Sequence, residues 1–278
     1  IVELFRSSTS VYIHSVFNVL PNILPILFFY KKKYTLDVHG VVPEEFEMNG
    51  RPLFARIYSL AEKVIFSRAA NIICVTNAMR DYYAKKYTSE KNYIVYTILP
   101  QNLDGYNIKD MDKEESVNII YSGNTQKWQN IDLMCSLIKN NLRPHVKYTI
   151  LTGDIANMHV FLKKYGLTEK TNIDIRSVMP SELGQFYKKA HYGFILRNDS
   201  TVNNVACPTK LVEYLHYGII PITISENIGD FKELGFDYVH YRNLENNLTV
   251  KKSIKNKNIV EMLQTINSSV NIKELTQC

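Results

Sequence analysis

Short β-rich apolar runs alternate with helical patterns along most of this 278-residue chain. Such alternation predicts parallel sheets covered by helices on both faces, because parallel strands need a crossover between them. We expect strands at 11–14, 34–38, 71–75, 93–99, 117–121, 147–151, 172–175, 192–196 and 220–224. We expect helices at 16–30, 51–68, 77–87, 131–139, 158–165, 180–189 (capped by Ser181), 209–217 and near 259–266. In the helix at 51–68, the apolar residues that share one face are Leu53, Ile57, Leu60 and Val64.

The alternation breaks once, in a polar segment that contains Gly105 and the charged run 110–115. We interpret this segment as a linker between two consecutive α/β domains. The second domain is expected to be a complete Rossmann-like unit, whereas the first has too few strands before the linker. The expected organisation is an N-terminal domain, a linker, a C-terminal domain and a tail with one helix, at 1–100, 101–116, 117–241 and 242–278 respectively.

Composition excludes several classes of chain. With 45% hydrophobic residues, 19 Tyr and 12 Phe, the chain is too apolar to be disordered. The four cysteines lie far apart and form no CxxC pair, which argues against a disulfide framework or a zinc site and fits a reducing cytosol. The net charge of +6 is too small and too scattered to indicate nucleic-acid binding, but it favours anionic partners such as phosphates.

The most apolar stretch, 16–30, is followed by three lysines at 31–33. It is too short to span a bilayer and contains Pro21 and Pro25. Two interpretations are open at this stage. The stretch is either a buried or half-buried helix of an α/β domain, or a surface that rests on a membrane with the lysines at the headgroups.

The densest chemical signal is CPTKLVEYLHYGIIP at 207–221. Pro208 stands at the expected start of a helix, and the free N–H groups of the first turn, at Thr209 and beyond, attract anions. Lys210 adds a positive charge in that turn, while Glu213 on the same face suits a hydrogen bond to a ribose diol. The alternative is an ordinary capped helix with an internal Lys210–Glu213 pair.

Two further segments provide candidate phosphate ligands. In YSGNTQKWQN at 121–130, a strand ends in a turn at Gly123 before a helix, which is the phosphate-cradle arrangement of α/β folds. Lys127 is the candidate cation there, or else a solvated surface residue. Arg197, after the strand 192–196, either pairs with a phosphate or forms a structural salt bridge.

The segment LDVHGVVPEE at 36–45 places His39 at the carboxyl end of a strand. Ligands of α/β folds bind in the crevice at such strand ends, so His39 is the candidate catalytic residue. Glu44 and Glu45 follow it closely. They either hydrogen-bond acceptor hydroxyls or cap the next segment.

The segment 207–221 resembles the nucleotide-sugar-binding signature of retaining glycosyltransferases of the GT-B fold, family 4 (group 1) type. Its PTK-L-x-E-Y-L-x-x-G-x-x-P form is common in bacterial surface-polysaccharide enzymes, and the resemblance extends over about 11–239. It implies two Rossmann-like domains facing a cleft, the N-terminal one incomplete. It further implies that the helix N-terminus and Lys127 bind the donor diphosphate, that Glu213 binds the ribose, and that His39 lies beside the transferred sugar.

Two positions depart from the family pattern. A glutamate that often touches the donor sugar is replaced by Val205, so sugar recognition is expected to fall to Asn203, Asn204 or nearby backbone groups. An arginine beside the glycine of the first loop is replaced by Asn124. The resemblance implies neither metal nor cofactor, and we reject the D-x-D metal motif at 110–112 because it lies in the charged linker.

Together, these observations predict a retaining, metal-independent hexosyltransferase. It would move a sugar from a nucleotide-diphosphate sugar to a glycan or polyprenyl-linked acceptor during surface-polysaccharide synthesis (lipopolysaccharide, O-antigen or capsule). We expect a cytoplasmic location with peripheral contact at the inner membrane face. Because Ile1 opens what looks like the middle of an element, we expect the N-terminal domain to lack its opening strands. The alternatives are a non-catalytic or truncated nucleotide-sugar-binding protein and, disfavoured by the absence of a convincing carboxylate pair, a sugar-nucleotide epimerase.

Overall fold

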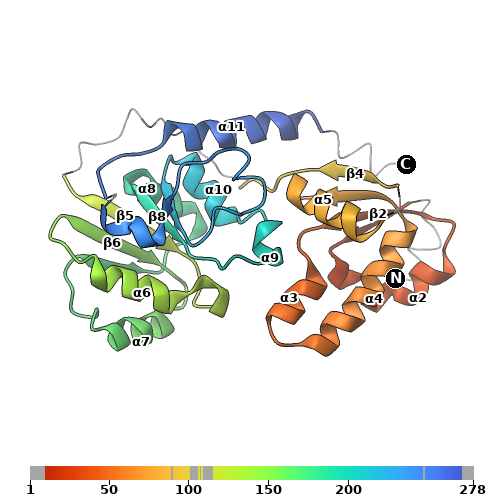
Figure 1. Ribbon diagram of the computed structural model, residues 1–278, viewed down its shortest axis with the longest axis horizontal. Coiled ribbons are helices and arrows are strands. Elements are labelled where there is room, and N and C mark those ends of the chain that lie inside the picture. The colour runs from red at the N-terminus through yellow and green to blue at the C-terminus, as the bar shows by residue number, and fades with distance from the viewer. Residues whose placement is uncertain are drawn as a thin grey trace.

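The computed structural model describes residues 10–88, 90–100, 106, 108, 115–246 and 248–270. Within these residues the strands form two separate parallel sheets, each with its own helices (Figure 1). The D-x-D motif at 110–112 and most of the expected linker lie outside the described residues.

The sheet of the N-terminal domain has the order β1-β2-β3-β4 and is parallel throughout. Its strands are β1 (Ser10–His14), β2 (Lys33–Val38), β3 (Ala69–Cys74) and β4 (Asn92–Val95). The helices are α2 (Ile23–Phe28), α3 (Val42–Met48), α4 (Pro52–Arg68) and α5 (Asn77–Lys86). β2 is buried from Tyr34 to Val38, as expected for a central strand covered on both faces. The register places His14 opposite Asp37, so the carboxyl ends of β1 and β2 meet at one edge.

The sheet of the C-terminal domain has the order β7-β6-β5-β8-β9-β10, also parallel. Its strands are β5 (Val117–Ser122), β6 (Val146–Leu151), β7 (Ile173–Arg176), β8 (Tyr192–Ile195), β9 (Ile220–Thr223) and β10 (Val239–His240). The strand order reverses between β5 and β8, which makes their carboxyl ends the switch point of a doubly wound sheet. Ligands of such sheets bind in the crevice at this point.

In the described part of this domain the α-helices are α6 (Ile131–Asn140), α7 (Ile155–Tyr165), α8 (Leu183–Lys189), α9 (Thr201–Asn204), α10 (Thr209–His216) and α11 (Ile254–Ser268). α11 runs from the C-terminal domain towards β4 of the other domain (Figure 1). At its end the Asn267 side chain bonds both the N–H and the C=O of Thr97, at 3.2 and 2.7 Å. The last helix therefore ties the two domains together.

A second connection between the domains lies at the start of α5. The Thr76 hydroxyl donates to the Val205 carbonyl at 2.7 Å. Gly229 has a φ of +49° and lies so close to the Ala206 carbonyl that a Cβ would stand 2.3 Å from its oxygen. Only glycine fits both this conformation and this contact.

The structure corrects three expectations about helices. The buried face of α4 is formed by Ala55, Ala61, Glu62, Ile65 and Phe66, whereas Leu53 and Leu60 are 67% and 69% exposed. Ser181 is no helix cap, since it lies inside the turn Pro180–Glu182, where the Glu182 carboxylate accepts from the Met179 N–H.

The third correction concerns 16–30, which is not one helix. It forms two short 3-10 turns, Val16–Asn18 and Leu20–Asn22, before α2, with Pro21 in the first turn of the second. Val16, Val19 and Ile26 are buried, but the large side chains that remain exposed are Phe17, Leu24, Leu27, Phe28 and Tyr30. In the part of the chain that the structure describes, no helix is long and apolar enough to cross a membrane.

Candidate functional site

The loop after β5 folds around the Tyr121 side chain. The Tyr121 hydroxyl donates to the Asn124 carbonyl, and a Cβ on Gly123 would lie 2.8 Å from that hydroxyl. The Gly123 N–H donates to the Leu151 carbonyl of the next strand at 3.0 Å. Lys127 begins a short 3-10 turn after this loop and is exposed. A Cβ at residue 123 would thus have to displace the Tyr121 hydroxyl, and the exposed Lys127 is available to a ligand.

Arg197 follows β8 on the other side of the switch point. Its guanidinium lies near the Tyr121 hydroxyl, and burial lowers the pKa of Arg197 below its usual value. Among the described residues Arg197 has no ion-pair partner, so the structural salt bridge is not found. A partly buried cation without a counter-ion favours an anionic ligand.

α10 begins at Thr209, which is exposed, and no side chain caps its first turn. The Lys210–Glu213 pair does form: Lys210 Nζ lies 2.8 Å from Glu213 Oε2. The same oxygen accepts from the Tyr187 hydroxyl at 2.8 Å. These two contacts fix the carboxylate and leave Oε1 without a hydrogen bond in the described residues, so Glu213 can still accept from a hydroxyl of a ligand.

The two asparagines of α9 differ in which hydrogen-bonding groups of their side chains have a partner. Asn203 is buried, and its amide donates to the Asn198 carbonyl at 2.7 Å. The amide of Asn204 donates to Asp199 Oδ1 at 2.8 Å, but Asn204 Oδ1 is buried without a partner among the described residues. A buried, unsatisfied amide oxygen is rare, and a ligand hydroxyl would satisfy it.

Glu44 and Glu45 both lie in the first turn of α3, where a carboxylate is favourable. Glu44 forms an ion pair with Lys86 at 2.7 Å and also accepts from the Tyr82 hydroxyl. The Glu45 carboxylate packs on Gly40, where a Cβ would meet Oε1 at 2.2 Å, and burial followed by the charge of Glu44 raises the pKa of Glu45. The contacts of Glu44 therefore join α3 to α5, and among the described residues no side chain caps the start of α3.

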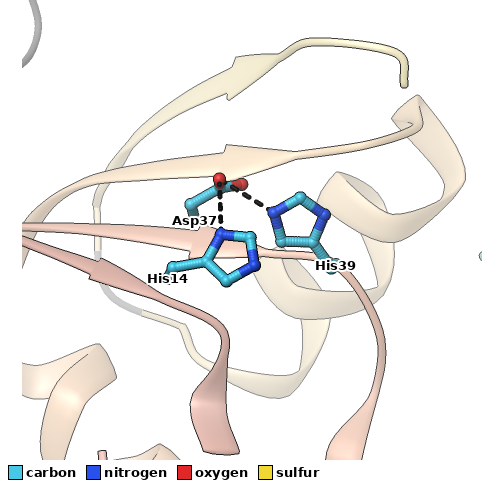
Figure 2. A group of neighbouring side chains, drawn as sticks. All are labelled: His14, Asp37 and His39. Atoms are coloured by element: carbon cyan, nitrogen blue, oxygen red, sulfur yellow. Dashed lines mark hydrogen bonds and ion pairs between the residues drawn. The ribbon is translucent and has the colours of Figure 1, made fainter. Parts of the chain in front are cut away.

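His39 belongs to a cluster that the sequence analysis did not identify (Figure 2). His39 Nε2 lies 2.9 Å from Asp37 Oδ2, and His14 Nδ1 lies 3.5 Å from the same oxygen, which also accepts from the Tyr12 hydroxyl. Burial raises the pKa of Asp37, but the hydrogen bonds from His39 and Tyr12 and the neighbouring imidazoles outweigh it and hold that pKa below its usual value. The signal for this cluster was the pairing of two strand ends, 11–14 and 34–38.

His39 and Asp37 line a cavity of about 530 Å³. Tyr12 and Tyr96 of the N-terminal domain and Asn267 of α11 also line it. None of the residues expected to bind the donor lines this cavity. The structure therefore groups the candidates by domain: Gly123, Lys127, Arg197, Lys210 and Glu213 belong to the C-terminal domain, and His39 to the N-terminal one.

No protein-family model matches the chain, and no curated protein matches its sequence. Solved structures do match. The pneumococcal O-GlcNAc transferase GtfA in complex with UDP and GlcNAc superposes with a TM-score of 0.65 at 10% identity, over 99% of this chain and 58% of GtfA. Anabaena Alr3699/HepE in complex with UDP-glucose gives 0.60 at 10% identity, over 99% and 72%. Sucrose-phosphate synthase from Thermosynechococcus elongatus gives 0.59 at 12% identity, over 96% and 68%.

These likenesses extend over almost the whole of this chain, although it spans only 58–72% of the three proteins compared. At such low identities they concern architecture. In this chain that architecture consists of two parallel α/β domains. The chain therefore has the GT-B fold, with both of its parallel-sheet domains represented.

Proposed function

We propose that this protein is a glycosyltransferase whose donor is a nucleotide-diphosphate sugar. The observation that carries the proposal is Arg197, a partly buried guanidinium without an ion-pair partner among the described residues, next to the switch point between β5 and β8. The uncapped N-terminus of α10, in the same domain, offers further N–H groups to an anion. The fold supports this function, since the neighbours include proteins solved with UDP or UDP-glucose.

The chemistry of transfer matches these groups. When the nucleoside diphosphate leaves, negative charge grows on its phosphates and positive charge grows at the anomeric carbon. Arg197, Lys127, Lys210 and the α10 N-terminus would stabilise the departing diphosphate, with Thr209 and Gly123 supplying backbone N–H groups. No metal is needed for this step, because the protein's own cations neutralise the charge.

The remaining donor contacts are proposed from side-chain oxygens that have no hydrogen-bond partner among the described residues. Glu213 Oε1 would accept from the ribose hydroxyls, while Lys210 and Tyr187 hold the other carboxylate oxygen. Asn204 Oδ1, buried without a described partner, would accept from a hydroxyl of the transferred sugar, and Asn203 would hold the loop that presents it. His39 would position the sugar and the acceptor, and front-face attack by an acceptor hydroxyl would retain the anomeric configuration.

An exposed surface of the N-terminal domain supports the proposal of a membrane-bound acceptor. Leu24, Leu27 and Phe28 of α2 are 63%, 42% and 79% exposed, and the lysines at 31–33 follow directly. No acidic residue occurs between 15 and 33. An exposed apolar helix with an adjoining cationic cluster is suited to an anionic bilayer surface.

Near α2, at the end of α4, the Arg68 guanidinium lies 5.9 Å from the centre of the Tyr30 ring. Leu53, Phe54 and Leu60 of α4 are likewise exposed. These exposed residues support our proposal of membrane contact. From the sequence resemblance we further propose a location at the cytoplasmic face and a lipid-linked glycan acceptor in surface-polysaccharide synthesis.

Labelled nucleotide sugars test the proposal. Release of nucleoside diphosphate, together with a labelled glycoside whose anomeric configuration is that of the donor, would support it. Tight binding of a nucleotide sugar with no turnover by any acceptor would instead support the non-catalytic alternative. Absence of both binding and turnover would contradict the proposal.

A further inference from the structure

His39, which the proposed function assigns to the sugar and the acceptor, also forms a cluster with His14 and Asp37. The three side chains come from the carboxyl ends of β1 and β2 and the residue that follows β2 (Figure 2). One ligand atom from each of the three residues lies within 4.8 Å of the other two. Both imidazole nitrogens point at one carboxylate oxygen, at 3.5 and 2.9 Å.

We propose that His14, Asp37 and His39 bind a divalent transition-metal ion such as Zn²⁺. Ligand bonds of about 2.0 Å in a tetrahedral site place the ligand atoms about 3.3 Å apart, and the two separations from Asp37 Oδ2 lie on either side of that value. Two imidazoles and one carboxylate select zinc, iron, cobalt or nickel over magnesium and calcium, which prefer oxygen ligands alone.

The surroundings of the cluster suit a bound cation. The Tyr12 hydroxyl donates to Asp37 and would hold the carboxylate in place after the metal replaces the two histidine contacts, as groups around metal ligands commonly do. The strand register pre-arranges two ligands, because His14 and Asp37 are direct neighbours in the sheet.

Three protein ligands leave a coordination position open. Asp37 and His39 line the cavity of about 530 Å³, so this position faces a space large enough for water or an oxygen of a ligand. The ion would lie in the N-terminal domain, in a cavity that no expected donor-binding residue lines. It would therefore be distinct from any ion bound to the donor diphosphate.

Metal titration of the untagged full chain tests the proposal. Chelator-stripped protein is titrated with Zn²⁺ by calorimetry, and with Co²⁺ while its visible absorption is followed. We expect one ion per chain and a cobalt spectrum typical of nitrogen and oxygen ligands. His14→Ala should weaken binding at least about tenfold, and His39→Ala should do the same.

His159→Ala is the matched control, since His159 is exposed on α7 of the other domain. Because the His14 side chain is 60% exposed, His14→Ala should leave the unfolding temperature unchanged, which separates loss of a ligand from loss of the fold. Absence of stoichiometric binding, or binding equal in His14→Ala and His159→Ala, would overturn the proposal. No nucleotide sugar enters the experiment, so its result is independent of the proposed transferase activity.

Discussion

The carboxylate of Asp230 accepts a hydrogen bond from the backbone N–H of Asn77 at 2.7 Å, across the boundary between the two domains. It also accepts from the Asn77 side chain at 2.9 Å and from the Ala78 N–H at 2.8 Å. A loop of the C-terminal domain thus caps helix α5 of the N-terminal one, where a negative charge also suits the helix dipole.

Asp230→Ala should weaken the connection between the domains. Loss of this cap should lower the free energy of unfolding by about 1–2 kcal/mol. It should also enlarge the radius of gyration, because fewer of the described contacts, among them those of Asn267 and of Thr76, would hold the domains together. Urea unfolding and small-angle scattering measure the two effects. Asp81→Ala is the control, since Asp81 is an exposed acid paired only with its neighbour Arg80, and equal behaviour of the two variants would refute the role of Asp230.

Arg197→Ala should impair binding of a nucleoside diphosphate. Loss of a hydrogen bond between charged groups corresponds to about 1.5–3 kcal/mol, or roughly 10- to 100-fold in affinity. Calorimetry with UDP and GDP gives the affinities. Arg242→Ala, which removes an exposed arginine that rests on Tyr241, should bind like the unaltered protein. If Arg197→Ala also bound normally, the guanidinium would have no part in donor binding.

Glu213→Ala separates ribose recognition from the structural role of the Lys210–Glu213 pair. If Oε1 binds the ribose, the substitution should weaken UDP binding about tenfold while leaving the affinity for inorganic pyrophosphate unchanged or higher, because Lys210 is released. A purely structural pair would give equal losses for both ligands, or none, together with a lower unfolding temperature.

Lys252 predicts a dependence of stability on pH. Its ammonium donates to the carbonyls of Tyr187 and Tyr217, both at 2.9 Å, and burial lowers the pKa of Lys252 to about 7. Between that pH and the ordinary lysine value the unfolded chain binds more protons than the folded one. The contribution of Lys252 to the free energy of unfolding therefore rises with pH across that window and is constant below it.

Lys252→Met should remove this rise, which is on the order of a few kcal/mol for a shift of this size. Urea unfolding of both proteins between about pH 6 and pH 10 measures it by linear extrapolation. Lys251→Met, at the exposed neighbouring residue, should keep the dependence of the unaltered protein. Parallel curves for Lys252→Met and the unaltered chain would show that Lys252 stays charged in the fold.

Membrane contact through α2 predicts binding to anionic vesicles. Leu24→Ser with Phe28→Ser should reduce co-sedimentation with phosphatidylglycerol-containing vesicles at least about tenfold, since burial of each side chain contributes about 1.5–3 kcal/mol. The control is Val160→Ser with Met179→Ser, which changes equally exposed apolar residues of the other domain. Equal binding by both double variants, or no binding by the unaltered protein, would exclude this surface.

The strands were predictable because the sheets are buried on both faces. β5, β8 and β9 are largely apolar runs, and such runs bounded by polar loops leave few alternatives. The face of α4 was not predictable from its leucines. It packs through Ala55 and Ala61 and buries Glu62, which bonds Lys86 at 2.6 Å and Tyr87 at 2.7 Å. Hydrophobic spacing carries no information about such a buried polar contact.

The candidate site divides in a similar way. His39 was recognisable because a residue at the end of a parallel strand faces the crevice of the fold. Its contacts with Asp37 and His14 depend on which strands are neighbours and on the register in which they pair. Neither could be predicted from the sequence alone. The Lys210–Glu213 contact followed directly from helical spacing, whereas the free oxygen of Asn204 needed the complete loop.

The most direct test of the account is the use of a donor by the purified chain. Labelled UDP-, GDP- and ADP-sugars are offered in turn, with anionic vesicles and a polyprenyl-linked glycan present, and release of nucleoside diphosphate is followed. We expect the purified chain to release nucleoside diphosphate from at least one donor. Arg197→Ala should strongly reduce this release, and Arg242→Ala should leave it unchanged. If the folded protein neither bound, hydrolysed nor transferred from any of these donors, the central claim would be contradicted.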